Sequence, residues 1–102
     1  MKLKYFHESI LREEILKIIK RYLDPKNYKV FFFGSRITGT GDEYSDIDLG
    51  IEGQKAIPIS TFAKIREDLN IIPTLYKIDV VDFHNTPVEF RRIAKNKIEY
   101  LN

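Results

Sequence analysis

Hydrophobic residues recur at helical spacing in two stretches of the chain, which predict two amphipathic helices. The first stretch covers residues 9–23, where Ser9 is a reasonable N-cap and Asp24-Pro25 ends the pattern. The second begins at Ser60, which we also expect to be a cap, and continues to about Leu69. The charged residues between the apolar positions of the first stretch predict a solvated face of that helix.

Three shorter stretches have the composition or the alternation of β-strands. They are residues 28–33, 46–52 and 76–83. After the third stretch, Thr86-Pro87 is a good helix entry, with proline at the first helical position. A C-terminal helix is therefore predicted over residues 88–101, either continuous or broken near Lys95-Asn96-Lys97.

The predicted order is helix, strand, strand, helix, strand, helix, which is an α/β (α+β) arrangement. A helix separates the second and third strands and suggests a crossover, whereas the first two strands are too close for one and are predicted to be antiparallel. We therefore expect a small mixed β-sheet with helices packed on one face. A chain of 102 residues fits one domain, spanning residues 1–102.

Composition narrows the classes of function. The chain has 17 basic and 15 acidic residues, a weaker basic bias than duplex-binding domains usually show, so we do not expect nucleic acid as a direct ligand. It has no cysteine, which excludes disulfides and thiolate metal sites. The longest unbroken apolar run, Val30–Phe33, is too short to span a membrane, and the charged N-terminus lacks the apolar region of a signal peptide. These features predict a cytoplasmic protein without a membrane partner.

One stretch, residues 33–51, concentrates the residues that could carry chemistry: FGSRITGTGDEYSDIDLGI. Gly34-Ser35 follows a predicted strand directly. A glycine lets the backbone come close to a ligand, and a hydroxyl with free amide groups suits phosphate oxygens. Most Gly-Ser pairs are simply turns, however, so this pair alone does not identify a phosphate site.

Asp46 and Asp48 stand two apart on a predicted strand, so both side chains point to one face, with Cα atoms about 6.6–6.8 Å apart. If the third strand packs its apolar face beside that of the second, Asp79 joins them on the open face. Three carboxylates raise one another's pKa, and two Mg²⁺ ions would offset that cost while ordering an NTP. A bare Asp-x-Asp is more often a solvated strand face, and Asp82, of opposite parity, is expected to be a surface or capping residue.

Together these residues resemble the signature of the DNA polymerase β-like nucleotidyltransferase superfamily in its minimal nucleotidyltransferase (MNT) branch. The signature is a strand ending in Gly-Ser, a basic residue, a further glycine and Ser-Asp-x-Asp-Leu, with a third carboxylate on a later strand. This chain matches it at Gly34, Ser35, Arg36, Gly39, Ser45, Asp46, Asp48, Leu49 and Asp79.

The resemblance implies a role for each matching polar residue. Gly34 and Ser35 would hold the β- and γ-phosphates of the NTP. Asp46 and Asp48 would ligate both Mg²⁺ ions, and Asp79 would ligate one and help to take the proton from the acceptor hydroxyl. Arg36 would either contact phosphate or brace the loop against Asp42 or Glu43.

The resemblance also implies a partner. Proteins of this branch are similar to antitoxins that transfer AMP from ATP to a tyrosine of a helical HEPN-domain toxin, so a hetero-oligomer is one possible state. ATP is an expectation from the family, because no residue here reads the base.

Three alternatives stay open at this point. The fold could be a binding module that neutralises a partner by masking it, with the carboxylates idle. It could be a small-molecule nucleotidyltransferase, although such enzymes usually carry an extra helical domain. It could also be a plain divalent-ion site without nucleotide chemistry.

Overall fold

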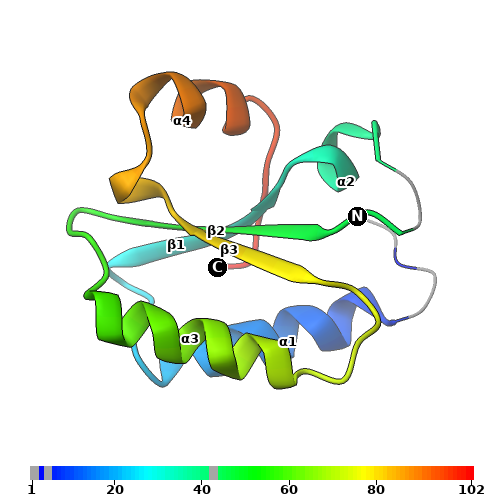
Figure 1. Ribbon diagram of the computed structural model, residues 1–102, viewed down its shortest axis with the longest axis horizontal. Coiled ribbons are helices and arrows are strands. Elements are labelled where there is room, and N and C mark those ends of the chain that lie inside the picture. The colour runs from blue at the N-terminus through cyan, green and yellow to red at the C-terminus, as the bar shows by residue number, and fades with distance from the viewer. Residues whose placement is uncertain (1–2, 4–5, 42–43) are drawn as a thin grey trace.

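A four-stranded sheet organises the computed structural model, which describes residue 3 and residues 6–41 and 44–102 (Figure 1). Its strands are β1 (Tyr28–Phe33), β2 (Ile47–Gly53), β3 (Ile78–Asp82) and β4 (Glu99–Tyr100), in the spatial order β3-β2-β1-β4. β1 is antiparallel to β2 and to β4, whereas β2 and β3 are parallel. The mixed sheet, the antiparallel first pair and the crossover between β2 and β3 confirm the prediction.

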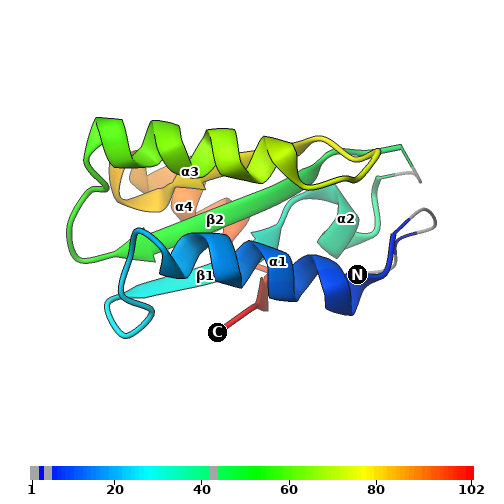
Figure 2. The same ribbon diagram turned by 90° about the horizontal axis from the view of Figure 1, so that it is seen from below.

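The two long helices, α1 (Glu8–Lys20) and α3 (Ile59–Ile71), lie side by side on one face of the sheet (Figures 1 and 2). Their apolar stripes pack against strand residues of one parity, because alternate side chains of a strand point to opposite faces. This main core includes Leu11, Ile15, Ile65 and Leu69 from the helices and Phe32, Ile47, Leu49, Ile51, Ile78 and Val80 from the strands. Each of these helices has 13 residues, and none in the described part of the chain is long and apolar enough to cross a membrane.

Both helices begin before the serine that was expected to cap them, so the two cap predictions were wrong. Ser9 and Ser60 are each the second helical residue, and the caps are His7 and Pro58. The backbone at His7 and Pro58 is extended, and their carbonyls accept the first helical hydrogen bonds without a side-chain cap. Proline fixes its own φ near −65°, which sets the chain direction at the start of α3 without help from a hydroxyl.

The opposite face of the sheet is partly covered by η1 (Phe83–Asn85) and α4 (Val88–Ala94) (Figure 1). A second, smaller core lies there, formed by Phe31, Phe33 and Phe83. The rings of Phe31 and Phe33 both meet Phe83 edge-on, with centroids 4.8 and 5.0 Å away. The prediction that helices pack on one face therefore holds for α1 and α3, whereas α4 lies across the sheet from them.

The C-terminal helix ends at Ala94, which confirms the predicted alternative of a break near Lys95-Asn96-Lys97, but the residues after the break do not continue as helix to residue 101. The chain turns after Lys95, whose ammonium bonds the Glu52 carboxylate at 2.5 Å, and returns as β4 beside β1. There the Leu101 amide donates to the Val30 carbonyl. Pairing the open edge of β1 satisfies backbone groups that a longer helix would leave exposed.

The third strand is also shorter than predicted, and Asp82 explains where it ends. Asp82 is its last residue, and its carboxylate accepts hydrogen bonds from the amides of His84 at 3.0 Å and Ile57 at 2.8 Å. It thereby caps η1 and ties the segment before α3 to the end of β3. The prediction of a capping role for Asp82 is confirmed.

The second core predicts a large stability effect at Phe83. Phe83→Ala should lower the free energy of unfolding by about 3–5 kcal/mol, because the fully buried ring leaves a cavity that its neighbours cannot fill. Phe90→Ala is the matched control, since Phe90 contacts the same cluster but is 40% exposed, and it should cost clearly less. Urea denaturation measures both, and equal losses would contradict a core centred on Phe83.

Candidate functional site

A row of three paired residues crosses the sheet from β1 to β3. Asp48 on β2 pairs with Phe33 on β1 and with Asp79 on β3. Neighbouring strands lie about 4.8 Å apart, and paired residues point to the same face. Both carboxylates therefore lie on the face opposite α1 and α3, as expected from their parity. Asp48 is half-buried, and the Asp79 side chain is 40% exposed.

Asp46 lies just outside the strand on which it was predicted. β2 begins at Ile47, whose amide donates to the Lys77 carbonyl, so Asp46 precedes the hydrogen-bonded ladder and is exposed. It is nevertheless close enough for its charge to act on Asp48. Asp46 therefore lies near the two strand carboxylates, but it is positioned by the segment that leads into β2 and not by the strand itself.

The three carboxylates are held in a costly arrangement. The pKa of Asp48 is raised above its usual value, first because burial disfavours the charged form, and then because Asp79 and Asp46 repel it. A cation bound between these groups would remove the repulsion. The site therefore gains more from a bound cation than an exposed carboxylate would.

Gly34 brings the backbone directly against Asp48. Its φ of 84° and ψ of −162° are in a region that is essentially restricted to glycine. A Cβ atom built on Gly34 would lie 2.1 Å from Oδ2 of Asp48. From the sequence, Gly34 was expected to let the backbone come close to a ligand. The structure gives a further reason for glycine here, because the backbone also comes close to the Asp48 carboxylate.

Two hydroxyls, those of Ser35 and Ser45, both lie close to Gly41. A Cβ atom on Gly41 would lie 2.7 Å from Oγ of both Ser35 and Ser45. Ser35 opens the short helix α2 (Ser35–Thr38), and its carbonyl accepts the amides of Thr40 and Gly41. Sequence reasoning assigned a role to Ser35 but none to Ser45, although the position of Ser45 directly before Asp46 was a signal that could have indicated one.

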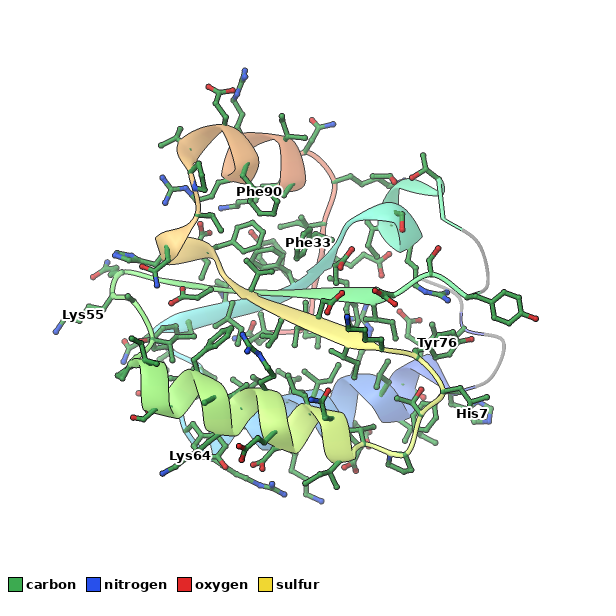
Figure 3. All side chains as sticks on the ribbon, viewed as in Figure 1. His7, Phe33, Lys55, Lys64, Tyr76 and Phe90 are labelled. Carbon is green, nitrogen blue, oxygen red and sulfur yellow. The ribbon has the colours of Figure 1, made fainter. Side chains whose placement is uncertain are left out.

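Arg36 contacts protein groups on two sides. Its Nε donates to the Ser45 carbonyl at 2.7 Å, and its guanidinium carbon lies 4.5 Å from the centroid of the Tyr76 ring. Figure 3 shows Tyr76 beside the start of β3. The predicted alternatives of bracing against Asp42 or Glu43 fall outside the described residues. From the sequence, Tyr76 was predicted only to be the first residue of a strand. No sequence pattern indicates its contact with Arg36.

Lys77 is a further group that sequence reasoning missed. Its ammonium lies 3.5 Å from Oδ1 of Asp79, and its side chain is 70% exposed. Lys77 and Asp79 share strand parity, which was the available signal. An exposed pair of this kind adds little stability, so the lysine is able to leave Asp79 when another cation arrives.

The carboxylates do not form a preformed metal cage. Within residues 3, 6–41 and 44–102, no group of three or more His, Cys, Asp or Glu side chains is arranged as a metal site. Mg²⁺ is commonly bound through one or two carboxylates together with substrate phosphates and water. The adjacent Asp48 and Asp79, with Asp46 beside them, fit a cation that arrives with a nucleotide better than they fit a purely structural metal.

Comparisons with known proteins find matches over most of the chain. Residues 13–101 match the family model described as polymerase beta, nucleotidyltransferase. The chain is 28% identical over 92 residues to a curated protein of Haemophilus influenzae named "Probable protein adenylyltransferase MntA", covering 88% of this chain and 81% of that one.

Solved structures share the fold. One is described as a toxin–antitoxin with AMP-PNP; it has a TM-score of 0.71 and 20% identity, and the match covers 89% of this chain and 72% of the other. Another is described as a tri-AMPylated HEPN toxin of Shewanella oneidensis in complex with an MNT antitoxin. It has a TM-score of 0.71 and 18% identity, over 94% of this chain and 72% of the other.

The contact between Gly34 and Asp48 predicts an unequal effect of two glycine substitutions. Gly34→Ala should destabilise the protein by about 1–3 kcal/mol more than Gly39→Ala, since it adds a steric clash to backbone strain. Gly39 has nearly the same φ, 83°, but its ψ of 9° lies in the left-handed helical region, which alanine tolerates better, and a Cβ there meets nothing within 4 Å. Gly39→Ala therefore reports the smaller cost of a positive φ alone. Equal losses in denaturant titrations would show that the backbone yields at Gly34 without cost.

The raised pKa of Asp48 predicts that Asp48→Asn stabilises the metal-free protein at neutral pH. The folded-state pKa lies above the usual 3.8, so the charged carboxylate costs stability above that folded value. As the pH falls through the folded pKa towards 3.8, the wild-type group becomes neutral and its disadvantage against asparagine should vanish. Denaturation in EDTA across this range measures the difference, with exposed Glu13→Gln as control. A gap independent of pH would contradict the electrostatic cause.

Proposed function

Because the chain belongs to the polymerase β nucleotidyltransferase family, we propose that it transfers AMP from ATP to a hydroxyl of a partner toxin and thereby acts as an antitoxin. The observation that carries the proposal is the pairing of Asp48 with Asp79, with Asp46 beside them and Gly34 packed on Asp48. This arrangement supports the proposal, because the carboxylates that the family's reaction would use lie beside Gly34 of the Gly-Ser pair.

In this proposal the three aspartates divide the work. Asp46 and Asp48 would hold two Mg²⁺ ions, and Asp79 would hold one of them and help to accept the proton of the attacking hydroxyl. When bound there, Mg²⁺ would supply charge stabilisation for the reaction. The acceptor oxygen bonds to the α-phosphorus, the bond from that phosphorus to the bridging oxygen breaks, and pyrophosphate leaves.

The phosphates of ATP need donors on the other side of the carboxylates. Gly34 and Ser35 fill that role in the proposal through the Ser35 hydroxyl and nearby backbone amides, because Gly34 packs on Asp48 and the Ser35 and Ser45 hydroxyls both lie beside Gly41. Arg36 was predicted either to contact phosphate or to brace the loop, and its contacts with Ser45 and Tyr76 favour a bracing role.

The partner is proposed from what the similar proteins are described as doing. A curated relative is named a probable protein adenylyltransferase, and a protein of the same fold is described in complex with an AMPylated HEPN toxin. We propose that a HEPN-domain toxin is the partner here, with a tyrosine as the acceptor, in a hetero-oligomer. A single domain over residues 1–102 and a cytoplasmic location remain predictions that belong to this proposal.

The first test is nucleotide binding. Calorimetric titration of ATP should show binding in Mg²⁺ that is lost in EDTA and in the double variant Asp46→Asn, Asp48→Asn, since removing both charges removes the cation ligands. Glu13→Gln, Glu67→Gln is the matched control, because it removes two exposed charges away from the site. Binding that survives in the Asp46, Asp48 variant would contradict the assignment of the site.

The second part of the same test identifies the acceptor. With α-labelled ATP, label should reach a HEPN toxin that is co-expressed with the wild-type protein. It should not reach the same toxin when the Asp46→Asn, Asp48→Asn variant replaces the wild type. Label on a small molecule in place of the toxin would support a small-molecule nucleotidyltransferase. Suppression of the toxin by the double variant, without any label, would mean that masking is sufficient.

A further inference from the structure

Of the three carboxylates, Asp46 is the one that the sheet does not hold. Asp48 and Asp79 lie inside the parallel ladder of β2 and β3, which fixes their backbones relative to each other. Asp46 precedes that ladder and is exposed. Its position therefore depends on contacts made by the residues around it. A contact at Ser45, its direct neighbour in the chain, would affect its position most directly.

Arg36 makes such a contact. Its Nε donates at 2.7 Å to the Ser45 carbonyl, which belongs to the peptide bond that joins Ser45 to Asp46. A hydrogen bond from a charged donor is about twice as strong as a neutral one. Because α2 itself is tied to Gly34 through the Ile37 and Thr38 amides, the bond links the segment of Asp46 to the segment that packs on Asp48.

Tyr76 fixes the other side of the guanidinium. The ring lies 4.5 Å from the guanidinium carbon, is 7% exposed, and belongs to the main core. Tyr76 also directly precedes Lys77, whose carbonyl accepts the Ile47 amide at the start of β2. The arginine is thus braced against a residue that the core holds still, immediately before the strand that carries Asp79.

We propose that Arg36 is a positioning residue, whose hydrogen bond to Ser45 and stacking on Tyr76 hold Asp46 where it shares a cation with Asp48 and Asp79. It acts on the bound cation through Asp46 and not as a ligand of the nucleotide phosphates. The proposal rests on the proposed function in one respect, namely that the carboxylates bind a divalent cation.

Mn²⁺ titration without nucleotide, followed by electron paramagnetic resonance, separates the two roles of Arg36. A positioning role predicts that Arg36→Met weakens Mn²⁺ binding about 10–100-fold, as is usual when a group that orients metal ligands is removed. A phosphate-binding role predicts unchanged or tighter Mn²⁺ binding, because a positive charge near the site is lost. Unchanged or tighter binding would overturn the proposal.

Arg66→Met is the matched control. Arg66 also lies over an aromatic ring, that of Phe62 at 5.0 Å, but on α3. It should leave Mn²⁺ affinity within about twofold, and thermal melts of both variants show whether Arg36→Met acts beyond a general loss of stability. Arg36→Lys should restore affinity only in part, since lysine can reach a carbonyl but lacks the planar group that stacks on Tyr76.

A double-mutant cycle tests the Tyr76 brace. Tyr76→Leu should weaken Mn²⁺ binding in the wild-type background and should add little in the Arg36→Met background, because both changes release the same contact. Fully additive losses would mean that Tyr76 acts independently of Arg36.

Hydrogen exchange provides a readout that needs no metal. In the metal-free protein, Arg36→Met should speed exchange in the peptide covering residues 44–47, whereas Arg66→Met should not. If the Asp46→Asn, Asp48→Asn variant bound Mn²⁺ as tightly as the wild type, the proposed function would fail. Hydrogen exchange in residues 44–47 would still decide the role of Arg36. Unchanged exchange in residues 44–47 would overturn the positioning role.

Discussion

Two carboxylates held side by side on adjacent parallel strands are the constraint on which the rest of this site depends. The pairing of Asp48 with Asp79 follows from the backbone ladder and not from any attraction between them. Burial and the neighbouring charges raise the pKa of Asp48, so the fold carries an unfavourable interaction at its functional face. The main core on the other face supplies the stability that makes this tolerable.

The sheet separates these two tasks by side-chain parity. On β2, Ile47, Leu49 and Ile51 face the long helices, while the alternate positions face the site and the aromatic cluster. Gly50 shows how tight the second side is, because a Cβ there would lie 2.5 Å from the Phe31 ring. One strand therefore supports a hydrophobic core, a second aromatic core and a polar site, within seven residues.

Local patterns were enough to predict what depends on alternation. The strand over residues 28–33 was predicted with its observed bounds, and the shared face of Asp48 and Asp79 followed from parity. The family signature identified Gly34, Ser35 and Asp46 as candidates before any geometry was known. What these residues have in common is that their signal lies within a few positions of one another or repeats along one strand.

Features that depend on distant contacts were not predictable in the same way. Residues 99–100 follow a helix-like pattern, but pairing with β1 overrides it. The stacking of Arg36 on Tyr76 joins residues 40 positions apart, and nothing near either residue in sequence indicates it. The starts of α1 and α3 were missed because extended residues, and not serine hydroxyls, set the direction of the chain there.

The parallel pairing of β2 with β3 also has a consequence for how the protein folds. β1 and β2 are joined by residues 34–46, whereas β3 is joined to β2 by the longer segment 54–77 that includes α3, so pairing β3 with β2 closes a longer loop. Asp79 meets Asp48 only when β3 docks on β2, so the electrostatic cost is concentrated in that association. We expect divalent cations to slow the detachment of β3 more than they speed its docking. A bound cation would then lengthen the lifetime of the folded state.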